Sequence, residues 1–393
     1  MPATLSYPGV YIEEIPSGVR TITGVATSIT AFVGRAMRGP TNEPITINSY
    51  GDFERIFGGL WVESRLGFAV RDFYLNGGSQ AIIVRLFHPF FASDAARADA
   101  LDAAQDADAA AQAVPGGDPP ANVAAAARGV ANDAANAAEP RKSAADAVAD
   151  AAEAAVAAGK NNAEVKAASA GAVGAAAPVT KATIDANGLK LVAASEGDWG
   201  NSLRARVDHD VAGGAADLFN LSLRDDKTGQ IEVFRNVSVV PGHPRQVDRV
   251  LQNGSSLVRM SGSLPAMPAA HDAGTGKDIW GDNAPETNDK VAGAGIASNG
   301  SGLVENDFTG PGLQNNKQGL YALRKADLFN LLCIPPYKPD DNVDTSLLST
   351  AVAFCTQSRA FMVMGSPEGW HTKDAAKSGL AGDIGIDSNY AAL

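Results

Sequence analysis

The stretch Ala81-Ile-Ile-Val-Arg-Leu-Phe87 is short and almost wholly apolar. A run of this kind is typical of a strand buried on both faces, as in the sheets of α/β proteins. Upstream of it, residues 76–78 read Asn-Gly-Gly, which supplies the left-handed positions that end helices. Apolar residues before this signal fall at helical spacing, at Leu66, Ala69, Val70, Phe73 and Tyr74.

An earlier helix is predicted from Ser49, which suits the N-cap position, with Asp52 three residues later. The segment 20–34 is rich in Thr, Ile and Val and predicts one or two strands. Arg38-Gly-Pro40 then breaks the chain. Strand, helix, helix and strand in this order form an α/β unit.

The N-terminal segment predicts an extended arm. Val10 and Ile12 alternate with Tyr11 and Glu13, which is the period of a strand with two unlike faces. Prolines, tolerated only at strand ends and edges, bracket this segment. Such an arm is too short to bury a core and needs a sheet edge to pair with. The arm comprises Tyr7, Pro8, Gly9, Val10, Tyr11, Ile12, Glu13, Glu14 and Ile15, and the hinge after it comprises Pro16, Ser17 and Gly18.

Residues from about 92 to about 178 are dominated by Ala, the residue with the best helix propensity. Gly116-Gly-Asp-Pro-Pro120 and Glu139-Pro140 interrupt this segment, and it lacks large apolar residues. We expect small helices with poor burial or partial disorder, in a surface insertion without chemistry.

Varied sequence returns at about residue 182. Strand-like segments at 189–193, 203–207 and 218–223, with a hairpin turn at Lys227-Thr-Gly-Gln230, predict a small antiparallel β domain. Residues from about 262 to about 318 predict loops. A short helix at 319–327, a buried strand at 328–335, an amphipathic helix at 347–357 and a buried strand at 360–364 then repeat the α/β rhythm.

Composition argues against several classes of protein function. The net charge of −12 argues against a general nucleic-acid binder, which needs a clustered basic surface. No long run of large apolar residues predicts a transmembrane helix, and the start at Met1 lacks the basic and apolar regions of a secretory signal. Cys333 and Cys355 lie in apolar surroundings and are expected to be buried free thiols.

No persuasive catalytic or metal-binding set emerges. The five histidines lack the spacing of a zinc site. The loop Ser366-Pro-Glu-Gly-Trp-His371 follows a buried strand, but a catalytic triad is assembled from distant segments, so a polar loop is the favoured interpretation.

Three further motifs are interpreted as structural. The turn 34–40 has neither glycine pattern of a phosphate cradle. Asp340-Asp-Asn-Val-Asp344 lacks the central Gly and closing Glu of a calcium loop and is expected to be a solvated acidic turn. Trp199 is expected to fold back onto the β domain rather than to form a ligand platform.

Several blocks together resemble the tail sheath family of contractile phage tails and phage-like contractile injection systems. The opening blocks are Tyr7-Pro-Gly-Val-Tyr-Ile-Glu-Glu14, Ile29-Thr-Ala-Phe-Val-Gly-Arg-Ala36 and Gly39-Pro40. The next are Phe53-Glu-Arg-Ile-Phe-Gly-Gly59, Phe73-Tyr-Leu-Asn-Gly-Gly78 and Arg85 in its apolar strand. The last are Gly197-Asp-Trp-Gly-Asn-Ser-Leu203, Asp327-Leu-Phe-Asn-Leu-Leu-Cys-Ile-Pro335 and Ala353-Phe-Cys355. The blocks occur in the family's order on both sides of the Ala-rich segment, which has no counterpart.

The resemblance implies a structural subunit that polymerises as stacked hexameric rings around an inner tube and contracts. It implies arms that add strands to a sheet of a neighbouring subunit, with Val10 and Ile12 facing the host and the hinge allowing rotation. The implied partners are further copies of the chain, the inner tube protein, and baseplate and cap proteins, with no direct nucleic-acid contact, no membrane insertion and no cofactor. Assembly would take place in the bacterial cytoplasm, and the product would be a phage virion or a phage-like particle.

The predicted fold class is therefore multidomain α+β or α/β. A core with a mixed sheet flanked by helices is joined by a small antiparallel β domain and an N-terminal arm strand. The expected divisions are the arm at 1–20, core at 21–91, the Ala-rich insertion at 92–180, the β-rich inserted domain at 181–318 and core again at 319–393. By resemblance, the family continues past this part with a final core portion, a tube-facing helix and a C-terminal arm. The expectation is therefore either that the sequence is incomplete at its C-terminus or that the chain is a shortened relative.

Two alternatives remain open from the residues. One is an α/β hydrolase-like enzyme that uses the loop after Met364. The other is a monomeric binding module that displays the Ala-rich insertion.

Overall fold

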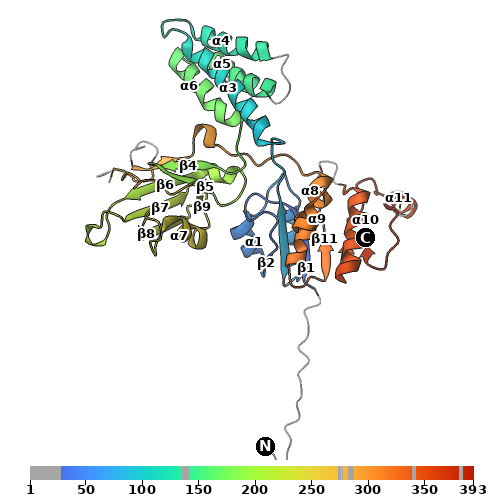
Figure 1. Ribbon diagram of the computed structural model, residues 1–393. Coiled ribbons are helices and arrows are strands. Elements are labelled where there is room, and N and C mark those ends of the chain that lie inside the picture. Colours follow the sequence, from blue (N-terminus) through green and yellow to red (C-terminus); the bar gives the residue numbers. More distant parts are fainter. Residues whose placement is uncertain are drawn as a thin grey trace, which may run out of the picture.

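The computed structural model describes residues 28–134, 141–272, 276, 278–281, 287–338, 342–379 and 384–393. The predicted arm and hinge, residues 7–18, lie outside the described residues, as do Asp340 and Asp341 of the acidic turn. Within the described residues, three parts are distinguished in Figure 1: a core with a mixed sheet, a helical bundle and a β domain.

The core sheet has six strands in the order β13-β12-β11-β1-β3-β2. All neighbouring strands are parallel except β2, which runs antiparallel to β3 at one edge. The strands are β1 (Thr30–Arg35), β2 (Ile45–Ile47), β3 (Ala81–Leu86), β11 (Leu331–Cys333), β12 (Phe361–Val363) and β13 (Ala391–Ala392). The prediction of a mixed sheet in an α+β chain is confirmed.

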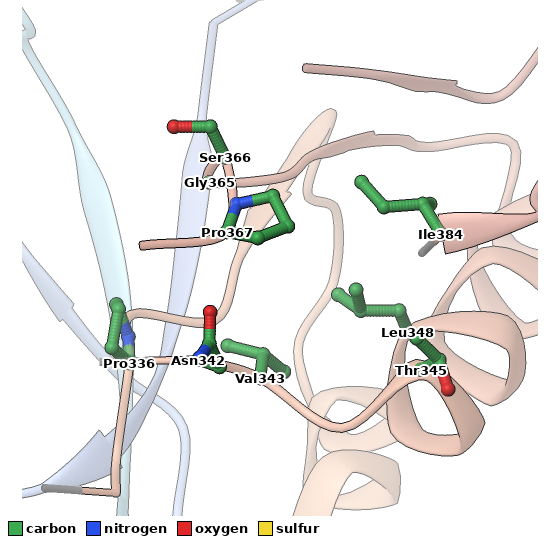
Figure 2. A pocket seen from close by; sticks show the side chains of 9 residues that line it. All are labelled: Pro336, Asn342, Val343, Thr345, Leu348, Gly365, Ser366, Pro367 and Ile384. Carbon is green, nitrogen blue, oxygen red and sulfur yellow. The ribbon is translucent and has the colours of Figure 1, made fainter. Parts of the chain in front are cut away.

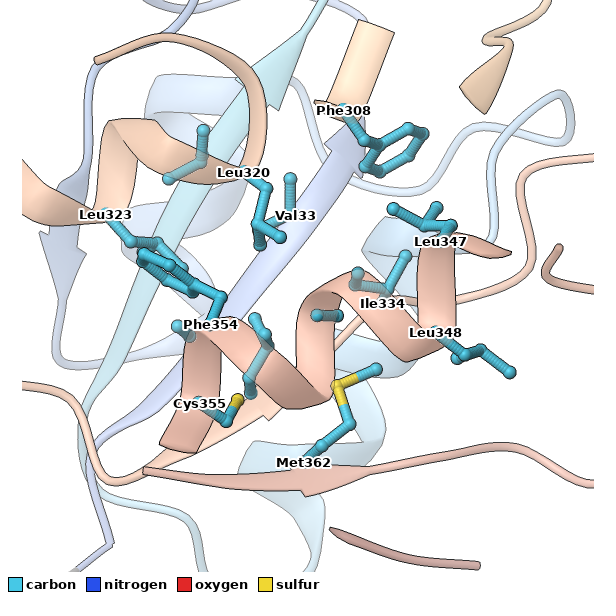
Figure 3. Packing of buried hydrophobic residues seen from close by; sticks show 14 of the residues in the cluster. Val33, Phe308, Leu320, Leu323, Ile334, Leu347, Leu348, Phe354, Cys355 and Met362 are labelled. Atoms are coloured by element: carbon cyan, nitrogen blue, oxygen red, sulfur yellow. The ribbon is translucent and has the colours of Figure 1, made fainter. Parts of the chain in front are cut away.

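Helices cover both faces of this sheet because successive strand residues point to opposite sides. Phe32 and Ile83 pack beneath α1 (Tyr50–Phe57) and α2 (Leu66–Leu75). Val33 and Val84 pack on the other side, where α10 (Thr345–Ser358), α8 (Glu305–Thr309) and the 3-10 turns of η6 (Gly319–Lys325) lie. Figure 3 shows Phe308, Leu320 and Phe354 in the hydrophobic cluster that also contains Val33. The short helices α9 (Leu313–Asn316) and α11 (Lys373–Gly379) complete the core.

The predicted local signals are confirmed. The Ser49 hydroxyl caps α1 by accepting a hydrogen bond from the Asp52 N–H at 3.1 Å. Helix α2 ends at the Asn76 cap, and Gly77 follows with a φ of +91°. Strand β11 is shorter than the predicted 328–335.

The Ala-rich segment forms a four-helix bundle, set apart from the rest in Figure 1. Its helices are α3 (Asp94–Ala113), α4 (Pro120–Asp133), α5 (Arg141–Ala157) and α6 (Asn162–Ala176). The expectation of poor burial is wrong. Ala104, Ala107, Ala127, Ala145 and Ala149 are fully buried against one another's helices. Small side chains let helices approach closely, so an Ala seam can form a core without large residues.

The β domain contains two antiparallel sheets, one in the order β10-β6-β7-β8 and one in the order β4-β5-β9. Its strands are β4 (Thr183–Ala186), β5 (Leu189–Ala193), β6 (Leu203–Asp208), β7 (Phe219–Asp225), β8 (Ile231–Val237), β9 (Val258–Met260) and β10 (Asp289–Lys290). Its helical segments are α7 (Val247–Gly254) and the 3-10 turns η2 (Asp198–Ser202), η3 (Ala212–Gly214) and η5 (Gly293–Gly295). Trp199 is 4% exposed and packs in this domain's core, so its predicted folding back is confirmed.

The bundle and the β domain leave and rejoin the core at one place. The Ser301 N–H donates to the His88 carbonyl at 3.0 Å, directly after β3 ends. His88 Nδ1 also lies 2.9 Å from a carboxylate oxygen of Asp307. Leu303, just past this junction, already packs in the core. The chain between residues 88 and 301 therefore forms a single excursion from the core sheet.

The alanine seam yields a stability prediction. Replacing Ala107 by Leu forces extra methyl groups into a fully buried position and should destabilise the bundle by about 1–3 kcal/mol. Ala109→Leu, an exposed position on the same helix, is the matched control and should change stability little. Hydrogen exchange of the bundle amides would report the difference. Equal protection in the two variants would contradict a tightly packed seam.

Candidate functional site

The most constrained polar site lies where the core meets the β domain, around Arg85 of β3. Its side chain is 1% exposed, although it is charged. The Nε–H donates to the Ala36 carbonyl at 2.8 Å, and Nη1 donates to the Gly39 carbonyl at 2.9 Å. These bonds hold the loop after β1 against the end of β3.

The same guanidinium reaches the β domain. Nη1 lies 3.0 Å from a carboxylate oxygen of Glu196, and Nη2 donates to the Glu196 carbonyl at 2.9 Å. Thr41 donates its hydroxyl to the same carboxylate, and Lys181 Nζ lies 3.4 Å from its other oxygen. The Glu196 carboxylate therefore joins three segments that are far apart in sequence.

The ionisation of this pair follows from its burial. Burial lowers the pKa of Arg85 to about 10, with the charge of Glu196 opposing that shift. Burial also acts to raise the pKa of Glu196, but the hydrogen bond from Thr41 and the charges of Lys181 and Arg85 outweigh it and lower the pKa below 4.5. Both groups are thus charged at neutral pH.

This network occupies the end of the sheet where open α/β proteins bind ligands. Such ligands sit beyond the carboxyl ends of the parallel strands. Here the space beyond β1 and β3 is filled by the loop 36–41 and by Glu196 of the β domain. The chain itself takes the place of a ligand at these two strands.

Two glycines allow the close approach. Gly39 has a φ of +102°, and a Cβ there would lie 2.7 Å from the Phe57 ring. Gly197 has a φ of +118°, and a Cβ there would lie 2.7 Å from the Met37 carbonyl oxygen. The Gly39 N–H donates to the Ser195 hydroxyl at 3.0 Å. The core loop and the β-domain loop therefore pack backbone against backbone.

The loop after Met364 borders a hollow of about 240 Å³. Figure 2 shows that Leu348 and Ile384 line it, while the Ser366 hydroxyl points away from them. Ser366, Glu368 and His371 are exposed. Among the described residues, no hydrogen bond joins the side chains of these three, and none of the hollow's lining residues is charged. The geometry gives no arranged nucleophile and base.

The other candidates from the sequence are structural. Cys355 is buried and Cys333 partly buried, both are free, and burial raises their pKa values to about 12 and about 11. Asp344, the last residue of the acidic turn, accepts hydrogen bonds from Tyr337 and Lys338, which precede the turn. In the described part of the chain, no cluster of three or more His, Cys, Asp or Glu residues could bind a metal. None of the described helices is long and apolar enough to cross a membrane.

Comparisons with known proteins give structural similarities only. No protein-family model matches the chain, and no curated protein matches it. A crystal structure of the sheath tail protein Lin1278 from Listeria innocua is similar over 86% of this chain and 48% of its own length, with 12% identity and a TM-score of 0.42.

A second similar structure is the sheath tail protein DSY3957 from Desulfitobacterium hafniense. It is similar over 90% of this chain and 52% of its own length, with 12% identity and a TM-score of 0.38. The chain thus spans about half the length of these two sheath tail proteins.

Sequence reasoning missed the Arg85–Glu196 pair. The one available signal was a charged residue inside an apolar strand, since a buried cation needs a partner. Nothing in the sequence identified Glu196 as that partner, because 111 positions separate the two residues.

The pair predicts a pH-dependent stability. Glu196→Gln leaves a buried cation without its counter-charge and should cost about 3 kcal/mol at neutral pH. The carboxylate's contribution is fully present above its ordinary pKa of 4.5 and is lost as the pH falls through its lowered folded-state value. Urea unfolding from neutral to acid pH should therefore show the two proteins converging.

The control is Glu63→Gln. Glu63 pairs with Arg35 at 3.3 Å but is 56% exposed, so its loss should cost less than about 1 kcal/mol. Equal losses in the two variants would contradict a special role for the buried pair.

Proposed function

We propose that this chain is a structural subunit of a contractile sheath, which polymerises in stacked hexameric rings around an inner tube. The observation that carries the proposal is how the family-like blocks come together. Gly39, of one block, packs on Phe57 of another, and Gly197 of a third packs on Met37, next to the first. Arg85 binds the Gly39 carbonyl. Blocks that resemble one family and meet at one junction support a shared architecture.

The junction explains why these residue types are needed at these positions of the blocks. The glycines adopt left-handed backbone conformations that allow the core and the β domain to approach closely. The buried arginine binds oxygen atoms from both parts. None of them is arranged for catalysis. We infer that the blocks preserve a rigid subunit shape, as a repeating lattice requires, and that the chain is not an enzyme.

Assembly needs free backbone at the subunit surface. The core sheet ends at β2 on one side and at β13 on the other. The inner side of β13 is paired, since Met362 and Met364 donate N–H bonds of 2.8 Å to the carbonyls of Tyr390 and Ala392. Within the described residues, no strand pairs with the outer side of either edge strand. An arm strand from a neighbouring copy would satisfy such an edge.

The arm of residues 7–15 is proposed as that guest strand, with Pro16-Ser17-Gly18 as the hinge. Val10 and Ile12 would face the host, and the hinge would let subunits rotate while the strand stays paired. The β domain and the Ala-rich bundle are proposed as insertions, with the bundle on the outer surface, where it cannot block ring packing.

Contraction then requires two packings of one lattice, the extended one being metastable. A gain of about 1–3 kcal/mol per subunit, typical of coupling energies, sums to a large total over many rings. The proposed partners are further copies of the chain, the inner tube, and baseplate and cap proteins. The proposed site of assembly is the bacterial cytoplasm, and the product is a phage virion or phage-like particle.

Electron microscopy tests the proposal. The full chain, co-expressed with its neighbouring genes, should form striated hollow cylinders in negative stain. Deleting residues 1–16 should abolish them, because the guest strand is lost. If cylinders still form after the deletion, the sheath proposal stands but the arm is not essential for assembly. Compact monomers alone would contradict the sheath and favour a binding module.

A matched pair of point variants tests whether only one face of the arm contacts the host sheet. Ile12→Asp places a charge on the face proposed to contact the host and should reduce the yield of cylinders. Tyr11→Asp places the same charge on the opposite face and should reduce it much less, since alternate residues point to opposite sides. Equal effects in the microscope would contradict a two-faced guest strand.

A further inference from the structure

A cleft of about 490 Å³ opens between the core and the β domain, beside the buried Arg85 network. Arg38 and Arg55 line it from the core, and Arg259 lines it from β9. The remaining polar lining is neutral, from Ser195, Ser255, Ser256 and Gln230, and no Asp or Glu lines the cleft. In a chain of net charge −12, this is a local concentration of positive charge.

The arginines are only partly neutralised. Arg38 donates to the Arg55 carbonyl at 2.9 Å and lies 3.8 Å from an Asp225 carboxylate oxygen. Its Nε is buried and has no hydrogen-bond partner among the described residues. Arg259 donates to the backbone carbonyls of Ser255 and Val258. Among the described residues, no carboxylate lies within ion-pairing distance of Arg259.

Arg55 is the most accessible of the three. It pairs with Asp52 at 2.8 Å, one turn along α1, and is 70% exposed. Such an exposed pair contributes little and exchanges readily. Glu232 of the β domain also lies beside the cleft, because it accepts hydrogen bonds from the lining residues Ser255 and Ser256. The guanidinium groups of Arg55 and Arg259 are therefore the donors that the cleft presents to an incoming carboxylate.

The bundle carries the complementary charge. Asp99 and Asp102 are exposed and three residues apart, so they lie on one face of α3. Within the described residues, neither carboxylate has a cation within ion-pairing distance; Asp106, on the same face, lies 3.7 Å from Arg141. The acidic face of α5 differs, because Arg128 pairs there with Asp146, Asp150 and Glu153.

We propose that the arginine cleft of one copy binds the acidic face of α3, at Asp99 and Asp102, in a second copy. Figure 1 shows the bundle projecting away from α1 and β9, which supply cleft residues, so the contact is between copies. Copies with a net charge of −12 repel one another, and a complementary patch offsets that repulsion locally. The inference rests on the proposed self-assembly and names one of its contacts.

Charge reversal with rescue tests the contact. Sedimentation velocity of the full chain at low ionic strength should show association that weakens as salt is added. Arg55→Glu with Arg259→Glu should weaken it about tenfold, and so should Asp99→Lys with Asp102→Lys. The chain carrying all four changes should regain the association, since the charges then match again.

Matched controls use the same charge changes elsewhere. Arg71→Glu on α2 and Asp133→Lys on α4 should leave the association unchanged. Circular dichroism would check that each variant folds, and all the altered cleft and α3 side chains named for reversal are at least partly exposed.

The outcomes separate this contact from the sheath itself. Weaker self-association in both double variants, with recovery of the association in the quadruple variant, supports the contact. No salt-dependent association in the natural chain, or no recovery in the quadruple variant, overturns it. Electron microscopy of the double variants tests the sheath separately. If both double variants form cylinders as well as the natural chain does, the sheath proposal stands and this contact is contradicted.

Discussion

The burial of Arg85 is the constraint from which the junction of the structure follows. A guanidinium that is 1% exposed cannot remain unpaired, so the chain must bring oxygen atoms to it. The loop after β1 supplies carbonyls, and the β domain supplies the Glu196 carboxylate and carbonyl. The β domain, which contributes no strand to the core sheet, is thereby fixed to the ends of β1 and β3.

The two inserted parts are stabilised by different means. The β domain has large buried side chains such as Phe219 and Leu191, besides its polar attachment to the core. The bundle relies on an alanine seam and reaches the rest of the chain through few polar contacts, among them Arg97 with the carbonyls of Pro178 and Ala294. Each buried alanine contributes little apolar area, so the bundle's stability depends on close packing of many small groups.

The sequence predicts local structure well where one signal decides it. The Ser49 cap, the glycines after α2 and the buried run of β3 are such cases. Sequence-based prediction fails where the structure depends on contacts between distant residues or on the joint packing of many residues. Alanine propensity predicts helices but not their mutual packing, and the partner of Arg85 lies in another domain. The cleft arginines Arg38, Arg55 and Arg259 likewise come from separate segments that only folding brings together.

A rigid junction determines where the proposed lattice of subunits could change. Because Glu196 and Arg85 tie the β domain to the sheet through buried, charge-assisted bonds, rotation between these parts would expose an unpaired charge. Movement is cheaper at contacts between copies, where exposed pairs exchange with water and with one another. In the proposed contractile sheath, subunits should therefore move as nearly rigid bodies. Their hinges then belong to the connecting arms, and the energy difference between the two lattices belongs to surface contacts that are remade.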